Sequence, residues 1–158
     1  MSALRHIIIT GVSSGIGLAI ARAALAKGYV VQGVGRNSPN ELDGQENWTF
    51  TPCDLTDLAA VDGLAFKAGA HTILVNNAGT LGPVAQSENA TAEEINACML
   101  LNVTAPMRLT ARFLQEVAGE KQVYFTGSGA AQYSIPGWSA YCASKAAIHM
   151  YAEVAAQE

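Results

Sequence analysis

Residues 10–17 read Thr-Gly-Val-Ser-Ser-Gly-Ile-Gly, and they stand between the apolar triplet Ile7–Ile9 and a stretch with helical spacing. Gly11 can form a tight turn, Gly15 lets the backbone approach a diphosphate, and Gly17 lets a helix lie close to a strand. The helix that begins here offers free N–H groups and the positive end of its dipole to phosphate. This stretch therefore predicts a dinucleotide site, against the alternative of an ordinary glycine-rich turn between a strand and a helix.

The rest of the chain repeats the same alternation of short β-branched runs and longer alanine-rich stretches, which is typical of βαβ units. Each run is mostly apolar on both faces, as a parallel strand covered by helices must be. We expect five strands, near residues 6–10, 29–34, 48–52, 72–76 and 122–126. The predicted fold is α/β, a Rossmann-type doubly wound parallel sheet, in one NAD(P)-binding domain over residues 1–158.

Three helical segments can be placed by periodicity. The first has Ile16, Ile20, Ala23 and Ala24 at helical spacing and should end at a left-handed cap on Gly28. The second, Thr91–Val117, opens with a capping box, and Pro106 leaves open one kinked helix or two short ones. The third covers about residues 138–158, with one face formed by Ala143, Ala147, Met150 and Val154.

Two connections are rich in Gly, Pro, Ser and Asn. Residues 35–47 are too few for a comfortable crossover helix, so a loop or a single turn is expected there. Residues 79–90 form a loop at the carboxyl end of the fourth strand, where an open parallel sheet presents its ligands.

The composition narrows the classes of function. Half of the 158 residues are hydrophobic, 14% are charged and the formal net charge is -4, which excludes a disordered or fibrous chain. Without a basic cluster, neither nucleic acid nor a membrane is an expected partner. The three cysteines lack CxxC spacing, so we expect no disulfide framework, no metal site and a cytoplasmic location.

Polar groups gather where the predicted strands end. Asn76-Asn77-Ala78-Gly79 follows the fourth strand, Ser128 follows the fifth, and Tyr141 and Lys145 are spaced to share a helix face. A phenol, with a pKa of about 10, becomes a useful acid or base when a fixed cation lowers that pKa. Taken singly, the Asn pair also fits an Asx turn and the Tyr–Lys pair a surface contact.

The end of the second strand indicates which dinucleotide is used. An acidic residue there binds a ribose 2′-hydroxyl, whereas an arginine can pair with a 2′-phosphate. Here the residues are Arg36 and Asn37, which favours NADP and leaves use of NAD as well open. Arg36 as a solvated loop cation is the alternative.

Together these motifs resemble those of the short-chain dehydrogenase/reductase family in its compact single-domain form. TGxxxGIG at 10–17, NNAG at 76–79, the serine at 128 and YxxxK at 141–145 occur in the family's order. Residues 137–145 and Arg36 add a looser likeness to sepiapterin and benzil reductases.

The resemblance implies a role for each catalytic residue. Tyr141 would be the general acid/base, and Lys145 would lower the pKa of that tyrosine and bind the nicotinamide ribose. Ser128 would position and polarise the substrate carbonyl. Asn102 matches an asparagine that holds a water in the family's proton relay; otherwise it is a polar residue filling a helix interior.

The resemblance also implies a cofactor site. Asp54 matches the family's adenine contact, although it could equally cap the next helix. The predicted cofactor-binding set is Gly11, Ser13, Ser14, Gly15, Ile16, Gly17, Arg36, Asn37, Asp54, Leu55, Asn77, Ala78, Gly79, Tyr141 and Lys145.

The expected function is an NADP-dependent oxidoreductase that transfers a hydride between NADPH and a carbonyl substrate such as a ketone or diketone, or the matching alcohol. The alternative is a catalytically incomplete dinucleotide-binding protein with an interaction or regulatory role. An epimerase or dehydratase is a third hypothesis, against which the spacing of Gly11, Gly15 and Gly17 speaks.

Members of the family continue past the helix that carries YxxxK, so we expect these residues to be the N-terminal part of a longer single-domain reductase. The fifth strand would then be an exposed apolar edge. The resemblance implies a homodimer or homotetramer formed through the helices around 91–117 and 138–158.

Overall fold

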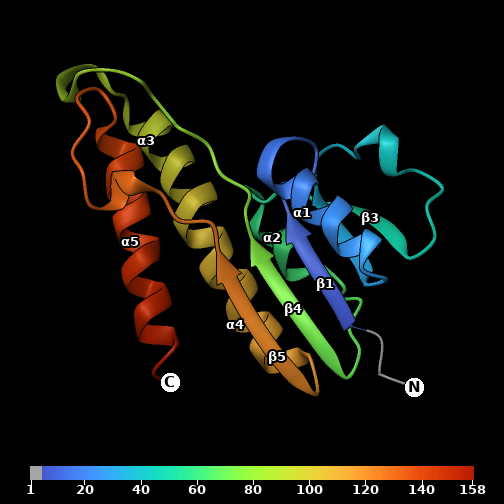
Figure 1. Cartoon of the computed structure of the whole chain (residues 1–158). Helices are drawn as coiled ribbons and strands as arrows, with labels where there is room; N and C mark the ends of the chain where they lie inside the picture. Colours follow the sequence, from blue (N-terminus) through green and yellow to red (C-terminus); the bar gives the residue numbers. More distant parts are fainter. Residues whose placement is uncertain (1–4) are drawn as a thin grey trace.

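A computed structural model describes residues 5–158, which form one five-stranded parallel sheet in the order β3-β2-β1-β4-β5 (Figure 1). The strands are β1 (Arg5–Thr10), β2 (Val30–Gly35), β3 (Trp48–Pro52), β4 (His71–Asn76) and β5 (Glu120–Phe125). All five predicted strands are confirmed, to within two residues at each end. The order reverses between β1 and β4, and in such sheets the crevice outside the carboxyl ends of these strands takes the ligand.

Five helices accompany the strands: α1 (Gly15–Ala26), α2 (Leu58–Asp62), α3 (Ala92–Met99), α4 (Ala105–Glu116) and α5 (Ser139–Ala155). In Figure 1, α4 lies behind β4 and β5, and α5 stands beside the β5 edge. The connection between β2 and β3 holds only a 3-10 turn at Asn40–Leu42, as expected. No helix within residues 5–158 combines the length and apolar character that crossing a membrane requires.

The central strand β1 is buried on both faces: its successive residues point to opposite sides of the sheet, and each side is covered. Ile8 belongs to the core that includes Leu109 and Phe113 of α4. Ile7 and Ile9 belong to the core on the other face, with α1. This two-sided burial accounts for the continuous apolar runs of the strands.

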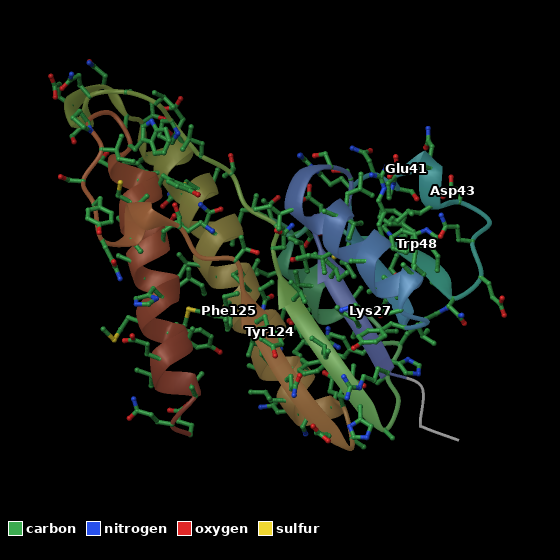
Figure 2. All side chains as sticks on the ribbon, viewed as in Figure 1. Lys27, Glu41, Asp43, Trp48, Tyr124 and Phe125 are labelled. Atoms are coloured by element: carbon green, nitrogen blue, oxygen red, sulfur yellow. The ribbon has the colours of Figure 1, made fainter. Side chains whose placement is uncertain are left out.

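Aromatic residues complete the packing at both edges of the sheet. On β3, the ring of Trp48 covers Gly33 of β2, where a Cβ would overlap the indole (Figure 2). Phe125, labelled with Tyr124 on β5 in Figure 2, packs edge to face on Tyr151 of α5, with ring centroids 5.9 Å apart. This contact holds α5 against the last strand.

The helix predicted from the spacing of Ile16, Ile20, Ala23 and Ala24 is confirmed as α1, but these residues do not all face the core. The buried residues are Gly17, Ala21 and Ala24, while the side chain of Ile16 is 60% exposed. A Cβ on Gly17 would overlap the carbonyl oxygen of Gly11, so the rotation of the helix is set by this close glycine contact rather than by its largest apolar residues. The predicted left-handed cap at Gly28 is confirmed, with φ of 75°.

The segment 91–117 forms α3 and α4 joined by a π-helical turn, Leu100–Thr104. The capping box between Thr91 and Glu94 is present. Pro106 stands in the first turn of α4, directly after the π-helical turn. The proline therefore interrupts the α-helical hydrogen bonding without ending the helical path.

The helix predicted over about residues 138–158 is confirmed as α5, but the face formed by Ala143, Ala147, Met150 and Val154 is not its buried one. Ala143 is exposed and Met150 is 58% exposed, while Ala140, Ser144, Lys145 and Ile148 are buried. Hydrophobicity alone does not identify the buried face because two polar residues, Ser144 and Lys145, point inward and bond Asn102 and Thr126.

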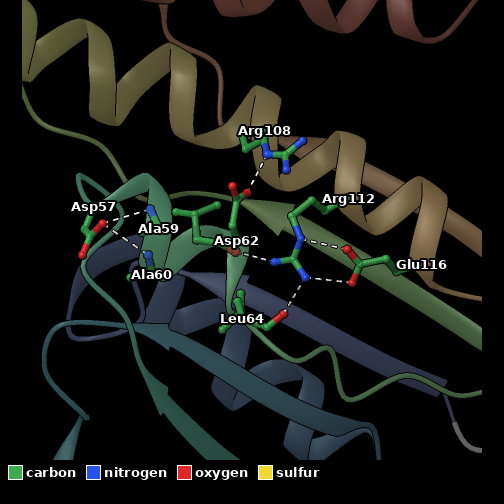
Figure 3. Close-up of polar contacts among 9 residues, drawn as sticks. Asp57, Ala59, Ala60, Asp62, Leu64, Arg108, Arg112 and Glu116 are labelled. Atoms are coloured by element: carbon green, nitrogen blue, oxygen red, sulfur yellow. Dashed lines mark hydrogen bonds and ion pairs between the residues drawn. The ribbon is translucent and has the colours of Figure 1, made fainter.

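An arginine cluster fastens the short helix α2 to α4 (Figure 3). Arg112 donates to the main-chain oxygens of Val61 and Leu64, the latter at 3.0 Å, and forms a two-pronged pair with Glu116 at 2.8 Å. Arg108 pairs with Asp62 at 2.6 Å. These contacts hold the end of α2 on the helix behind the sheet.

Candidate active site

A cavity of about 440 Å³ opens at the carboxyl edge of the sheet. Its walls come from the glycine turn and from the segments that follow β2, β3 and β4, with Ala97 and Leu101 from the α3 side. Most of the predicted cofactor residues line it, namely Gly11, Ser13, Ser14, Arg36, Asn37, Asp54, Leu55, Asn77, Ala78 and Gly79. The structure thus brings together residues from four separate strand ends.

The glycine turn has the geometry that its sequence predicts. Gly11 has φ of 71°, and a Cβ there would come within 2.8 Å of the Cα of Ala78. Gly15 has φ of 59° and open space where a side chain would be. A larger residue at either position would be strained, and at Gly11 it would also collide with the segment after β4.

Some predicted cofactor residues do not line this cavity: Gly15, Ile16, Gly17, Tyr141 and Lys145. Gly17 packs against Gly11, and the side chain of Ile16 points into solvent. Tyr141 and Lys145 lie on α5, beyond the β5 edge.

Arg36 and Asp54 are charged residues that both line the cavity. Hydrogen bonds from Thr56, 2.9 Å from its N–H and 2.8 Å from its hydroxyl, hold the pKa of Asp54 below its usual value, and Arg36 adds to this. Asp54 does not cap α2. The cap is Asp57, which accepts from the first N–H groups of that helix. Asp54 instead closes a turn beside the cavity.

A chain of hydrogen bonds crosses the carboxyl edge of the sheet. The side-chain amide of Asn77 donates to the main-chain oxygens of Thr10 (3.1 Å) and Gly11 (3.0 Å). The hydroxyl of Thr126 donates to Asn77 Oδ1 at 3.1 Å, and Lys145 Nζ donates to the carbonyl of Thr126 at 2.9 Å. The glycine turn and the ammonium on α5 are therefore fixed relative to one another.

Lys145 is the most deeply placed cation at this edge. Its residue is 8% exposed, and burial lowers the pKa of its ammonium. Nζ lies 5.7 Å from the centre of the Tyr141 ring, and Trp138 meets that ring edge to face at the same distance. The i, i+4 spacing thus places the phenol and the ammonium together, as predicted.

A second cavity, of about 450 Å³, lies between β5 and α5 and is lined by both Ser128 and Lys145. The Ser128 hydroxyl accepts from the N–H of Ala130 at 3.2 Å. Tyr141 lines neither of these two cavities.

The side chain of Asn102 is buried, 3% exposed, in the π-helical turn. Its amide exchanges two hydrogen bonds of 2.8 Å with the main chain of Thr80 and donates to the hydroxyl of Ser144 at 3.0 Å. Both N–H groups of the amide are used, so a water in a relay would have to donate to an oxygen of Asn102 rather than accept from its side chain. Pro106 lacks an N–H, so it cannot donate to the carbonyl of Asn102 four residues earlier.

Sequence reasoning missed several residues that build the site. Thr80 and Thr56 line the first cavity, Thr10 Oγ1 accepts from the N–H groups of Asn77 and Ala78 at 3.0 Å, and Ser144 bonds Asn102. The Asp-Leu-Thr spacing of an Asx turn could have indicated Thr56. Ser144 falls three residues after Tyr141, close enough for a back-bond within the helix.

The comparisons with known proteins agree with this geometry. The family model for short chain dehydrogenases matches residues 5–158. A benzil reductase ((S)-benzoin forming) of Bacillus cereus is 33% identical over 98% of this chain, and an NADPH-dependent pterin aldehyde reductase of Arabidopsis thaliana is 29% identical over 99%. The chain spans 69% of each of these relatives, and 63% of a benzil reductase of Bacillus subtilis.

A solved structure from Burkholderia vietnamiensis, titled a short-chain dehydrogenase/reductase, superposes with a TM-score of 0.91 at 32% identity. The match covers 98% of this chain and 79% of that one. With the sheet order, the glycine turn and the Tyr141–Lys145 pair in place, and with a family model that matches nearly every residue, the chain belongs to the short-chain dehydrogenase family.

Proposed function

We propose that this protein is an NADP-dependent carbonyl reductase, and that Tyr141 is its proton donor. The observation that carries the proposal is the hydrogen-bond chain from the glycine turn through Asn77 and Thr126 to Lys145. It links the cavity of about 440 Å³ to an ammonium that lies beside the Tyr141 ring. The family, whose members are oxidoreductases, supplies the class of reaction.

The residues present fit a dinucleotide. The N-cap Ser14 makes no side-chain cap bond and the first turn of α1 has no acidic residue, so its N–H groups and dipole are free to hold a diphosphate. Arg36 lies where it can pair with a 2′-phosphate, and the name of the Arabidopsis relative states NADPH dependence. Bound NADPH would supply the hydride that reduces the carbonyl carbon.

The side chains supply the other groups that the reaction needs. Tyr141 donates its phenolic proton to the carbonyl oxygen, and the nearby ammonium of Lys145 stabilises the phenolate that forms. Ser128, from the loop after β5, orients the same oxygen by hydrogen bonding. Asp54, Leu55, Asn77, Ala78 and Gly79 hold the nucleotide.

Replacing Tyr141 by Phe tests this assignment. Tyr141→Phe removes the proton donor and leaves the nucleotide cavity intact, so we expect turnover of diketones such as benzil to fall by at least about 1,000-fold. The dissociation constant for NADPH, measured by fluorescence titration, should change less than twofold. The same titration with NADH measures the preference that we assign to Arg36.

Tyr133→Phe is the matched control, because that tyrosine is exposed on the loop before α5. It should keep wild-type turnover. Equal activity of Tyr141→Phe and the wild type would refute the role of Tyr141. Binding of NADPH by the wild type without turnover of diketones or aldehydes would favour the alternative, a dinucleotide-binding regulatory protein.

We further propose that residues 5–158 act as one cytoplasmic NAD(P)-binding domain that assembles into a homodimer or homotetramer. The support is a set of large apolar side chains left exposed on the helices around 91–117 and 138–158: Ile95, Met107, Leu114, Met150 and Val154. Sedimentation velocity measures the assembly directly.

A further inference from the structure

A buried polar junction lies where the loop after β4, the π-helical turn and α5 meet. We call it the Asn102 junction; its members are the main chain of Thr80 and the side chains of Cys98, Asn102 and Ser144. Ser144 and Cys98 are 0% exposed. Ser144 lies between the two α5 residues that carry the proposed chemistry, three positions after Tyr141 and one before Lys145.

The hydrogen bonds of this junction diverge from the Asn102 amide towards Thr80 and towards Ser144. The carbonyl of Thr80 accepts from the Asn102 amide at 2.8 Å, and the same amide donates to the Ser144 hydroxyl at 3.0 Å. That hydroxyl donates in turn to the main-chain carbonyl of Tyr141 at 2.8 Å. In a buried setting such linked bonds strengthen one another.

The Ser144 hydroxyl therefore fixes the first turn of α5 against the cavity wall. Thr80 lines the dinucleotide cavity, so the bonds join that wall to the backbone of Tyr141. A serine that bonds the carbonyl one turn earlier also bends the helix locally. Alanine would favour the helix more, and it would leave an Asn102 N–H without this acceptor.

The thiol of Cys98 fills the remaining side of the junction. Its Sγ lies 3.5 Å from Asn102 Nδ2, and the loop passes directly over it at Gly82. Burial raises the pKa of the Cys98 thiol, which keeps it neutral. No member of the junction is charged, so the hydrogen bonds of Ser144 set its geometry.

We propose that Ser144 is a positioning residue for the reaction: through Asn102 it sets the distance and angle between Tyr141 and the dinucleotide cavity. This inference rests on the proposed function, because it assigns Ser144 no contact with substrate and acts only through Tyr141. A small misplacement of a reacting group costs up to about 100-fold in rate.

The test compares Ser144→Ala with Ser139→Ala, which removes an exposed hydroxyl from the first residue of the same helix. For Ser144→Ala we expect kcat to fall about 10- to 100-fold, with the NADPH dissociation constant within about twofold of wild type. The pH at which kcat is half-maximal should also move, because the environment of the phenol changes. Ser139→Ala should match the wild type in all three measurements.

Two further variants separate positioning from folding. Ser144→Thr keeps the hydroxyl and should recover most of kcat. Combining Asn102→Ala with Ser144→Ala should lower kcat no further than the worse single change, since both break one chain of bonds. Additive losses would mean that the two residues act separately, and would overturn the inference.

The outcomes distinguish this inference from the proposed function. If the wild type turns over carbonyl substrates and Ser144→Ala does so with unchanged kcat and pH profile, the inference is wrong and the proposed function stands. If neither the wild type nor Ser139→Ala turns over any carbonyl while both bind NADPH, the proposed function is wrong and the inference falls with it.

Discussion

At the scale of single residues, Lys145 combines a structural cost with the chemical role that we propose for it. Its ammonium is buried and its pKa is lowered by that burial, yet it keeps a hydrogen bond to Thr126 and lies beside Tyr141. A group whose pKa is lower in the folded state binds more protons when unfolded. Lys145 therefore disfavours folding below its folded pKa, and this cost disappears as the pH rises towards 10.5, its ordinary value.

Lys145→Met removes the ammonium that we propose stabilises the phenolate, so it should abolish turnover. It should not lower the melting temperature at pH 7. The apolar side chain removes the burial cost, a trade of stability for activity seen at many active sites. Any stability advantage of the variant should shrink as the pH rises towards 10.5, the ordinary pKa of the lysine, which thermal unfolding at several pH values measures. A melting temperature that falls at pH 7 and stays equally low at pH 10 would contradict this prediction.

At the scale of elements, the π-helical turn between α3 and α4 depends on Pro106. The π-helical turn brings Asn102 inward to Thr80 and Ser144, and the missing N–H of Pro106 leaves the Asn102 carbonyl without its α-helical donor. Turns of this kind are common at functional sites. The proline therefore supports the site through backbone geometry.

Pro106→Ala should restore that donor and convert the π-helical turn towards regular α-helix. We expect an equal or higher melting temperature together with a fall in kcat, because Asn102 would rotate away from its partners. Amide exchange of residue 106 reports the new bond. Unchanged kcat with a protected amide at 106 would show that the turn is not needed.

The arginine cluster also fixes two elements to one another, α2 and α4 (Figure 3). Arg112 supplies donors to two buried carbonyls and to Glu116, so Arg112→Met should lower the free energy of unfolding by about 2–4 kcal/mol. Urea denaturation measures this. Arg22→Met, which breaks an exposed pair with Glu41, is the control and should change stability by less than about 1 kcal/mol.

At the scale of the whole molecule, two surfaces stand out. Within residues 5–158, β5 is an edge strand of the sheet, and α5 turns Met150 and Val154 outward beside it. The first cavity lies where the strand order reverses, and none of its lining residues belongs to β5 or α5. Self-association and nucleotide binding should therefore respond to different substitutions.

Met150→Glu places a charge on the exposed face of α5. It should weaken self-association at least about tenfold, because an unpaired charge is costly inside an interface, while NADPH affinity stays unchanged. Sedimentation velocity of both proteins over a range of concentrations checks it. Identical concentration dependence would show that this face is not the interface.

The fold and much of the nucleotide cavity follow from the sequence. Residues 10–17, the five apolar runs and the loops after them could be placed because short-range rules govern them: parallel strands bury both faces, and glycine alone tolerates the turn at Gly11. The i, i+4 rule likewise joined Tyr141 to Lys145.

Features that depend on contacts between distant segments could be seen only in the folded protein. The rotation of α1 is set by Gly17 against Gly11, and that of α5 by the bonds of Ser144 and Lys145 to Asn102 and Thr126. Hydrophobic periodicity identified both helices but not their buried faces, because it assumes that polar side chains seek water. Here their partners lie inside the protein, supplied by strands and helices that are distant in the sequence.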